Sequence, residues 1–183
     1  MAHRRKIVLA GLAAGAVTVW AVAAGAQEAQ SPGVAPEKFK AWELLCPQSM
    51  AKDKPRICEV RTFITSNEGV RLGALAIALN PDPGAQEMPM IATALLPLGV
   101  DLTLMPTLQV GEGKPLPLQF RRCLQRGCEA VAAVGAEHLT VLRAGTLAKV
   151  AVGIGGGKNA VFEFSLAGFT AAHDEIKRRA RKS

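Results

Sequence analysis

The sequence has few groups suited to acid–base catalysis. It contains three histidines in 183 residues, and His3 lies in an N-terminal segment that we expect to be removed. His138 lies in an apolar stretch and is expected to pack partly buried, whereas His173 precedes Asp174 and is expected to be solvated. Ser165 lacks the Gly-x-Ser-x-Gly frame of a nucleophile elbow. We therefore predict no enzyme, although a triad from distant segments needs only to meet in space.

The central part of the chain has almost no net charge. The full sequence has 22 Lys and Arg against 15 Asp and Glu, a formal charge of +7. Three of the basic residues precede residue 7 and five lie in the tail 177–183. The segment from residue 7 to residue 176 therefore has 14 basic and 15 acidic residues. A near-neutral body lacks the electrostatic footprint of a nucleic-acid-binding protein, so no nucleic acid is expected as a partner. The basic tail is expected to complement the negative end of a helix dipole, with weak contact to anionic lipid as the alternative.

The N-terminus has the parts of a secretory signal peptide. Three basic residues at positions 4–6 precede an uncharged run over 7–26, which ends in Ala-Gly-Ala before polar Gln27. This pattern predicts a signal peptide over 1–26 and a periplasmic or secreted protein. An uncleaved anchor is the alternative, because the run is nearly long enough to span a bilayer, but its Ala and Gly content makes it weakly hydrophobic. After cleavage, no transmembrane segment is expected.

Four cysteines remain after that cleavage, in two close pairs: Cys46 with Cys58, and Cys123 with Cys128. An even number of cysteines in an exported protein predicts structural disulfides. We expect the local pairing, because the first two lie on one face of neighbouring strands and the second two bracket a short hairpin loop. Metal and redox roles are disfavoured, since the spacings are C-x11-C and C-x4-C without a nearby His. No catalytic, metal or cofactor-binding residue is predicted.

Short alternations of apolar and polar residues, separated by breakers, predict a mainly β fold. The expected architecture is an antiparallel β-sandwich or barrel-like domain with a short C-terminal helix. The expected strands cover 42–46, 58–64, 70–79, 88–96, 100–104, 116–120, 128–134, 147–152 and 160–166. The nearly continuous apolar run over 70–79 is expected to be a fully buried strand.

Two segments carry helical signals. Residues 137–144 are ambiguous, although Leu139 and Leu142 fit one helical turn and Gly145 suits a C-terminal cap. The last helix is expected to begin with Thr170 as its N-cap. The spacing of Phe169, Ala172 and Ile176 would then place them on one face of this helix.

A glycine-rich stretch over 153–158 resembles a phosphate-binding loop only superficially. The motif requires a Gly at position 152 and a Ser or Thr at position 159, where this chain has Val152 and Asn159. We expect a flexible turn between two strands instead, and no nucleotide cofactor.

Several motifs, in order, resemble the invasion-associated locus B family of exported bacterial proteins. They are Phe39-x-x-Trp42-x-x-x-Cys46, Cys58-Glu59, Leu96-Pro97-Leu98-Gly99-Val100, Phe120-x-x-Cys123 with Gly127-Cys128, and Phe164-Ser165-Leu166-x-Gly168-Phe169-x-x-Ala172. Residues 27–38 contain Ser31-Pro32-Gly33 and Pro36 and little to bury, so they are expected to form a flexible leader, and residues 177–183 form the basic tail. The resemblance covers residues 39–176 and implies a disulfide-containing β domain there. It implies that Trp42 and Phe120 are core residues and that Gly99 and Gly168 form turns. It supplies no catalytic residues.

These observations favour an exported envelope or secreted binding protein that is not an enzyme, contributing to adhesion or host-cell invasion. Its partner would be a protein or another envelope component. A periplasmic structural or chaperone-like accessory, acting through exposed strand edges, is the alternative. A small hydrolase around His138 or Ser165 is less favoured. An exposed apolar patch would support a binding protein, whereas a cleft with convergent polar groups would support the enzyme.

Overall fold

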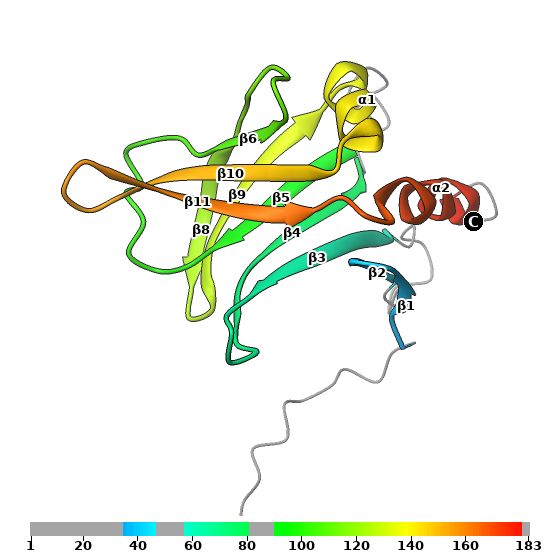
Figure 1. Cartoon of the computed structure of the whole chain (residues 1–183), viewed down its shortest axis with the longest axis horizontal. Helices are drawn as coiled ribbons and strands as arrows, with labels where there is room; N and C mark the ends of the chain where they lie inside the picture. Colours follow the sequence, from blue (N-terminus) through cyan, green and yellow to red (C-terminus); the bar gives the residue numbers. More distant parts are fainter. Residues whose placement is uncertain (1–34, 47–56, 81–89, 181–183) are drawn as a thin grey trace, which may run out of the picture. The chain divides into compact units, whose positions relative to one another are not determined.

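The computed structural model describes residues 35–46, 57–80 and 90–180, which form two antiparallel sheets and two helices. The first sheet contains, in spatial order, β1 (Glu37–Phe39), β2 (Trp42–Leu45), β3 (Glu59–Thr65), β4 (Arg71–Leu79), β5 (Met90–Leu96), β9 (Gly127–Val134) and β8 (Gln119–Leu124). The second contains β11 (Lys158–Ser165), β10 (Leu147–Ile154), β6 (Thr107–Val110) and β7 (Leu116–Pro117). The helices are α1 (Ala136–Ala144) and α2 (Phe169–Ala180) (Figure 1).

The two sheets share one apolar core and remain separate, so the described strands form no closed barrel. Side chains alternate between the two faces of a strand, and the inward members from both sheets are fully buried. Leu75 and Ile77 come from β4, whereas Val150 and Phe164 come from β10 and β11. The predicted mainly β fold with a short C-terminal helix is therefore confirmed.

The prediction that residues 70–79 form a fully buried strand is wrong. Within β4, only Gly73, Leu75 and Ile77 are buried. Alanines at 74, 76 and 78 occupy the outer face and are half-buried, and the first two residues of β4 are exposed. The apolar run is continuous because small alanines stand on the solvent side of an antiparallel sheet, which needs only one buried face.

The strand predicted over 100–104 is also absent. Val100 makes an isolated antiparallel bridge to Ile154, and the chain then leaves the extended conformation. The Asp101 carboxylate accepts hydrogen bonds from the Thr103 amide at 2.9 Å and the Thr103 hydroxyl at 2.6 Å. This local turn competes with strand pairing and explains why an alternating pattern did not become a strand.

Helix α1 resolves the ambiguous segment, and Gly145 ends it by donating its amide to the Val141 carbonyl at 2.9 Å. The N-cap assigned to Thr170 is wrong, because α2 already begins at Phe169. The Thr170 hydroxyl instead donates to the Arg143 carbonyl at 2.9 Å and so joins the two helices.

One face of α2 is buried against the first sheet. Phe169, Ala172 and Ile176 lie on it, as predicted, and the Phe169 ring packs on Trp42 with centroids 4.9 Å apart. His173 lies on the same face and is 1% exposed, so the expectation that it is solvated is wrong. A residue four positions after Phe169 returns to the same face of a helix, whatever the polarity of its neighbours.

The turn over 155–157 joins β10 and β11, as expected for the glycine-rich stretch. The proposed signal peptide, the first part of the leader and the end of the tail lie outside the described residues, as does most of the loop between Cys46 and Cys58. Strand β1 begins at Glu37, inside the segment assigned to the leader, and α2 continues through Ala180 into the segment assigned to the tail. Within the described ranges, no helix combines the length and the apolar character needed to cross a membrane.

Candidate binding surface

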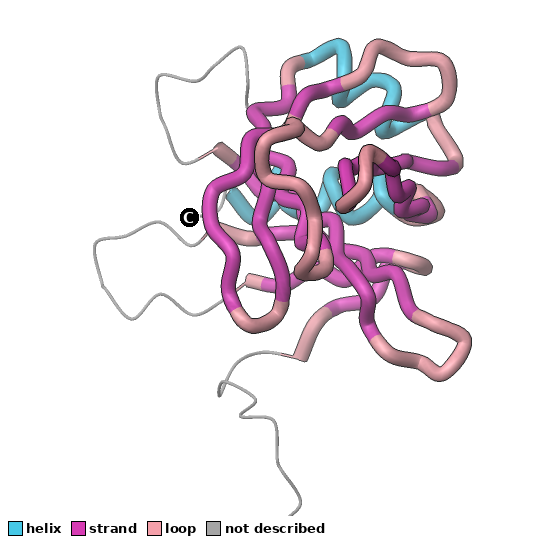
Figure 2. The backbone as a smooth tube through the Cα atoms, turned by 90° about the vertical axis from the view of Figure 1, so that its left-hand side faces the viewer, coloured by secondary structure: helices cyan, strands magenta, loops and turns pink. Residues whose placement is uncertain are grey.

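Four connections between strands meet at one end of the sandwich. Thr65 pairs with Arg71 beside the β3–β4 turn, and Leu96, the last residue of β5, pairs with Cys128 beside the β8–β9 turn. Val100 bridges to Ile154 next to the β10–β11 turn. We call residues 66–72, 97–106, 124–127 and 154–158 the loop end. In Figure 1 these connections lie to the left and lower left, away from both helices, and in Figure 2 the same side faces the viewer.

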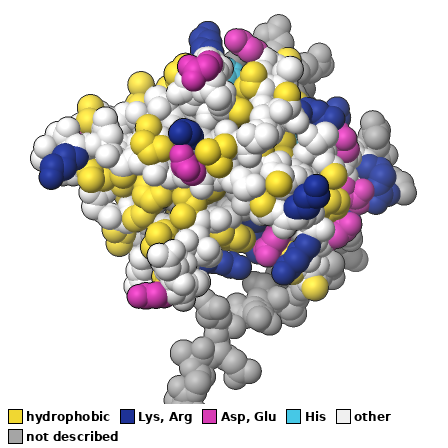
Figure 3. Space-filling model, in the orientation of Figure 1, with side chains coloured by type: hydrophobic (Ala, Val, Ile, Leu, Met, Phe, Trp, Pro, Cys, Tyr) yellow, Lys and Arg dark blue, Asp and Glu magenta, His cyan; other side chains and the backbone are white. Residues whose placement is uncertain are grey.

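Exposed apolar side chains are concentrated at the loop end. The structure has nine large hydrophobic residues that are exposed within its described part. Seven of them belong to the loop end: Val70, Leu72, Leu98, Leu102, Leu104, Met105 and Leu124. Figure 3 shows hydrophobic side chains gathered on the left half of one face, around the β10–β11 hairpin. Such a concentration on an otherwise polar surface is typical of a binding site.

The longest of these connections, the β5–β6 loop over 97–106, is fixed to the second sheet. The Asp101 amide donates to the Gly153 carbonyl at 2.8 Å, and the Leu118 amide donates to the Pro106 carbonyl at 2.7 Å. Leu104 Cδ1 lies 2.9 Å from the point where a Cβ of Gly153 would stand, so the absence of a side chain at Gly153 makes room for this leucine. The loop therefore presents its apolar residues from a defined position.

Cationic side chains lie among these apolar residues. Arg126 and Lys158 are exposed and have no acidic partner within the described ranges. The Arg71 guanidinium lies over the Phe63 ring, 3.8 Å from its centroid. The loop end also carries Glu68 and Asp101, and the hydrogen bonds from Thr103 lower the pKa of the Asp101 carboxyl. Its carboxylate thus remains charged and bound within its own loop.

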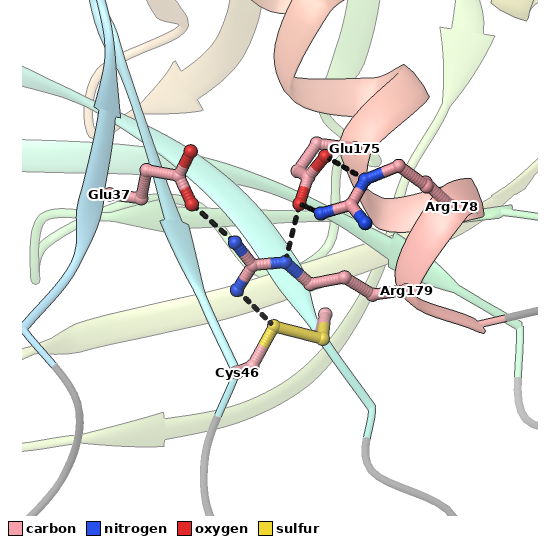
Figure 4. Close-up of a disulfide and its surroundings, with 6 residues drawn as sticks. Glu37, Cys46, Glu175, Arg178 and Arg179 are labelled. Carbon is pink, nitrogen blue, oxygen red and sulfur yellow. Dashed lines mark hydrogen bonds and ion pairs between the residues drawn. A yellow bond between two sulfur atoms is a disulfide. The ribbon is translucent and has the colours of Figure 1, made fainter. Parts of the chain in front are cut away.

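The helix end has a different arrangement, in which charges are paired. Arg178 and Arg179 donate through Nε to the two oxygens of Glu175, at 2.6 and 2.7 Å, and these bonds lower the pKa of Glu175 to about 2. Arg179 also binds Glu37 of β1, and its Nη1 lies 3.6 Å from Cys46 Sγ (Figure 4). One cation of the predicted basic tail, Arg179, therefore joins α2 to β1 and the first disulfide, whereas Arg178 bonds within α2.

Disulfides join Cys46 to Cys58 and Cys123 to Cys128, with Cα atoms 4.2 and 3.9 Å apart. Leu45 pairs with Glu59 in antiparallel strands, so Cys46, which follows Leu45, faces Cys58, which precedes Glu59. Cys123 and Cys128 are themselves paired residues of the β8–β9 hairpin. The first disulfide lies near α2, whereas the second lies beside the loop end and holds the turn that presents Leu124.

The structure does not assemble the residues considered for catalysis. His138 is half-buried on α1, as expected, and Ser165 is exposed at the end of β11. The Ser165 hydroxyl accepts from the Ala167 amide at 3.3 Å, and no hydrogen bond between described residues joins it to a histidine. Within the same ranges, no group of three His, Cys, Asp or Glu side chains is placed to hold a metal ion.

Sequence reasoning missed the loop end. The alternating pattern assigns Leu102 and Leu104 to a strand and places Leu98 in the break before it. It assigns no role to Met105. The signal that could have revealed the loop end is the Asp101-x-Thr103 pattern, which favours a local turn. Leucines in such a turn do not join a sheet and are therefore left exposed.

A disulfide-containing domain of two antiparallel sheets, with its last helix packed on the first sheet, is the class that the fold defines. The model of the family described as invasion associated locus B (IalB) protein matches residues 42–177, so the chain belongs to this family. The crystal structure of invasion associated protein B from Bartonella henselae is similar, with a TM-score of 0.70 and 21% identity over 81% of this chain and 99% of that one. A comparison with curated proteins finds no match.

Proposed function

We propose that this protein is an exported, non-enzymatic binding protein of the bacterial envelope or the secreted fraction, contributing to adhesion or host-cell invasion. It contacts its partner through the loop end. The observation that carries the proposal is the gathering there of seven of the nine large hydrophobic residues that are exposed in the described part of the chain. Exposing these side chains to water is unfavourable, and burying each against a partner would recover about 1.5–3 kcal/mol before the costs of association.

The disulfides and the family support the same proposal. Disulfides form and persist in oxidising compartments, which is consistent with export. The family is named for its association with invasion. The proposed site is also preorganised, because the β5–β6 loop is hydrogen-bonded to β10 and less entropy is lost when it binds.

Two of the four edge strands in the described part of the chain, β8 and β11, favour this proposal over a chaperone-like role based on strand addition. Strand β8 is an edge of the first sheet and carries Arg121 and Arg122. Strand β11 is an edge of the second sheet, and its Glu163 pairs with Lys149 of β10 at 3.0 Å. The Trp42 indole also donates to the Ser165 carbonyl at 2.9 Å, where β11 ends. Charged and capped edges oppose the addition of another strand.

The proposal is tested by measuring binding to natural surfaces. Fluorescently labelled protein, purified after export, is added to cultured animal cells and to bacterial envelope fractions. We expect saturable binding to at least one of them. The triple variant Leu98→Ser/Leu102→Ser/Met105→Ser changes three exposed loop-end side chains, and it should weaken binding at least tenfold, or about 1.4 kcal/mol.

Ile57→Ser is the matched control. Ile57 is 40% exposed and lies beside Cys58, before β3, so it is an exposed apolar residue at the end of β3 opposite its turn. This variant should bind as the parent does. Absence of saturable binding to both surfaces would refute the proposed function, and equal losses in the two variants would refute the assignment to the loop end.

A further inference from the structure

We infer that the loop end docks on a phospholipid bilayer that carries anionic headgroups, with its leucines and methionine entering the acyl region. This inference rests on the proposed function, because it names the partner of the same surface. It is drawn from the distribution of apolar side chains, their chemical type and the charges between them.

The apolar side chains of the loop end come from several separate turns. Val70 follows the β3–β4 turn, Leu124 ends β8 at the β8–β9 turn, and Leu102 and Met105 lie on the β5–β6 loop; all four are 53–67% exposed. A protein interface buries its apolar residues in a compact central patch surrounded by polar groups. Side chains carried by neighbouring turns can each enter a fluid apolar layer without a complementary pocket.

The residue types favour lipid over protein. Binding hot spots on protein partners are rich in Trp, Tyr and Arg, with Leu under-represented. The chain has no tyrosine and two tryptophans; of these, Trp42 is completely buried in the core. All seven exposed loop-end hydrophobics are aliphatic or methionine. Such side chains gain free energy from any hydrocarbon environment in proportion to the area that they bury.

The charges complement an anionic surface. Arg126 and Lys158 flank the β5–β6 loop from the two neighbouring turns and lack acidic partners in the described part of the chain. Arg71 adds a third cation, whereas Glu68 and Asp101 are the acids of this end. Long basic side chains can keep their charge at the headgroups while their stems follow the apolar surface. Each contributes about 1 kcal/mol near an anionic leaflet.

The helix end is less suited to such contact. Arg178 and Arg179 are already bound to Glu175 and Glu37, so their charge is largely compensated. Docking through the loop end directs α2 away from the bilayer, as the placement of the two ends in Figure 1 indicates. If the basic tail bound anionic lipid instead, the helix end would face the bilayer, so the two modes of binding predict opposite orientations.

The experiment uses protein-free vesicles and the exported full domain. Vesicles of phosphatidylcholine alone, and of phosphatidylcholine mixed with phosphatidylglycerol, are sedimented with the protein, and the bound fraction gives the partition coefficient. We expect binding to the mixed vesicles that weakens with added salt. Leu98→Ser/Leu102→Ser/Met105→Ser should lower the partition coefficient at least about tenfold, and Ile57→Ser should not change it.

Arg126→Ala/Lys158→Ala should lower partitioning onto the mixed vesicles by about tenfold or more, with little change on phosphatidylcholine alone. Arg181→Ala/Lys182→Ala tests the tail and should have no effect. No partitioning onto mixed vesicles, while cells or envelope fractions still bind the protein, would overturn the lipid inference and leave the proposed function standing. Partitioning that only the tail variant abolishes would overturn it in favour of the tail.

Discussion

Arg143 of α1 and His173 of α2 are in direct contact, with Nη1 of the arginine 2.6 Å from Nδ1 of the imidazole. A guanidinium only donates hydrogen bonds, so Nδ1 must accept and the ring proton must be on Nε2. Nε2 is buried and has no hydrogen-bond partner among the described residues. The ring stacks on Phe169 with centroids 5.8 Å apart. The helix junction therefore requires a neutral histidine.

This contact predicts a loss of stability at mildly acid pH. Burial and the positive charge of Arg143 lower the pKa of His173 below its usual 6.5, Lys177 lowers it further, and Asp174 acts in the opposite direction. Between the folded and the unfolded pKa, the unfolded chain binds more protons. The contribution of His173 to stability is therefore complete above about pH 6.5 and decreases as the pH falls toward the folded pKa. Urea unfolding measured across this range should show the decrease.

His173→Leu provides the comparison for that measurement. Leucine keeps an apolar side chain between α2 and the sheet and removes the titrating group, and Arg143 retains its ion pair with Asp174 at 2.6 Å. The variant should show a flatter dependence of unfolding free energy on pH between about 7 and 5. An equally steep dependence in both proteins would assign the effect to other groups.

The purified protein should have no hydrolase activity that depends on His138, His173 or Ser165. His173 is engaged by Arg143, and no hydrogen bond within the described ranges joins Ser165 to either histidine. Alanine at each position should leave any measured turnover unchanged. A loss greater than about tenfold, or about 1.4 kcal/mol of barrier, in a variant with an unchanged circular dichroism spectrum would contradict this.

Most of the strand framework follows from alternation along the chain. The patterns around Trp42 and Val60 predict strands with one buried face, and both residues are fully buried. Alternation has two limits in this sequence. In β4, the pattern of apolar residues is the same whether the outer alanines are half-buried or fully buried, so it does not predict which. Over 100–104, the alternating pattern predicts a strand and takes no account of the Asp101–Thr103 hydrogen bonds that form a turn.

The environment of His173 and the loop end depend on tertiary structure that no local pattern contains. His173 is buried because α2 packs on the first sheet and meets Arg143, which is 30 residues earlier in the chain. The loop end exists because turns from distant segments meet, as the bridge between Val100 and Ile154 shows. Charge patterns near His173 suggested solvent, but helix periodicity and packing determined its position.

The exported protein should begin at Gln27. The Ala-Gly-Ala sequence at 24–26 is the one well-placed small-x-small site before polar sequence. Intact-mass analysis of protein collected from the periplasm or culture medium should give the mass of residues 27–183. Protein that retains residues 1–26 and sediments with membranes would indicate an uncleaved anchor.

The disulfides should be found as the local pairs and should stabilise the domain unequally. By the chain-entropy estimate, sequence separations of 12 and 5 correspond to about 3 and about 2 kcal/mol. Peptide mapping of non-reduced protein should give a Cys46–Cys58 and a Cys123–Cys128 peptide. Cys46→Ala/Cys58→Ala should lower the unfolding free energy more than Cys123→Ala/Cys128→Ala does. A peptide joining the Cys46 and Cys123 regions would exclude the pairing.

Gly168 and Gly99 offer a test of how α2 is fixed to the first sheet. Their φ angles are nearly equal, at +91° and +90°, so an alanine at either position has similar backbone strain, about 1–2 kcal/mol. Their surroundings differ. A Cβ at Gly168 would lie 2.0 Å from the Phe39 carbonyl oxygen, whereas nothing lies within 4 Å of one at Gly99. This close approach brings the start of α2 against the β1–β2 connection, where the Ala41 amide donates to the Ala167 carbonyl at 3.2 Å.

Gly168→Ala should therefore lower the unfolding free energy by more than about 3 kcal/mol, and Gly99→Ala by only the cost of strain. Urea unfolding of both variants measures the difference. Because backbone strain is common to the two substitutions, the excess in Gly168→Ala reports the close contact with Phe39 and Lys40 of the β1–β2 connection. Equal losses would mean that α2 can move away from the β1–β2 connection without cost, and that the Phe169–Trp42 contact, not the glycine, fixes the helix on the sheet.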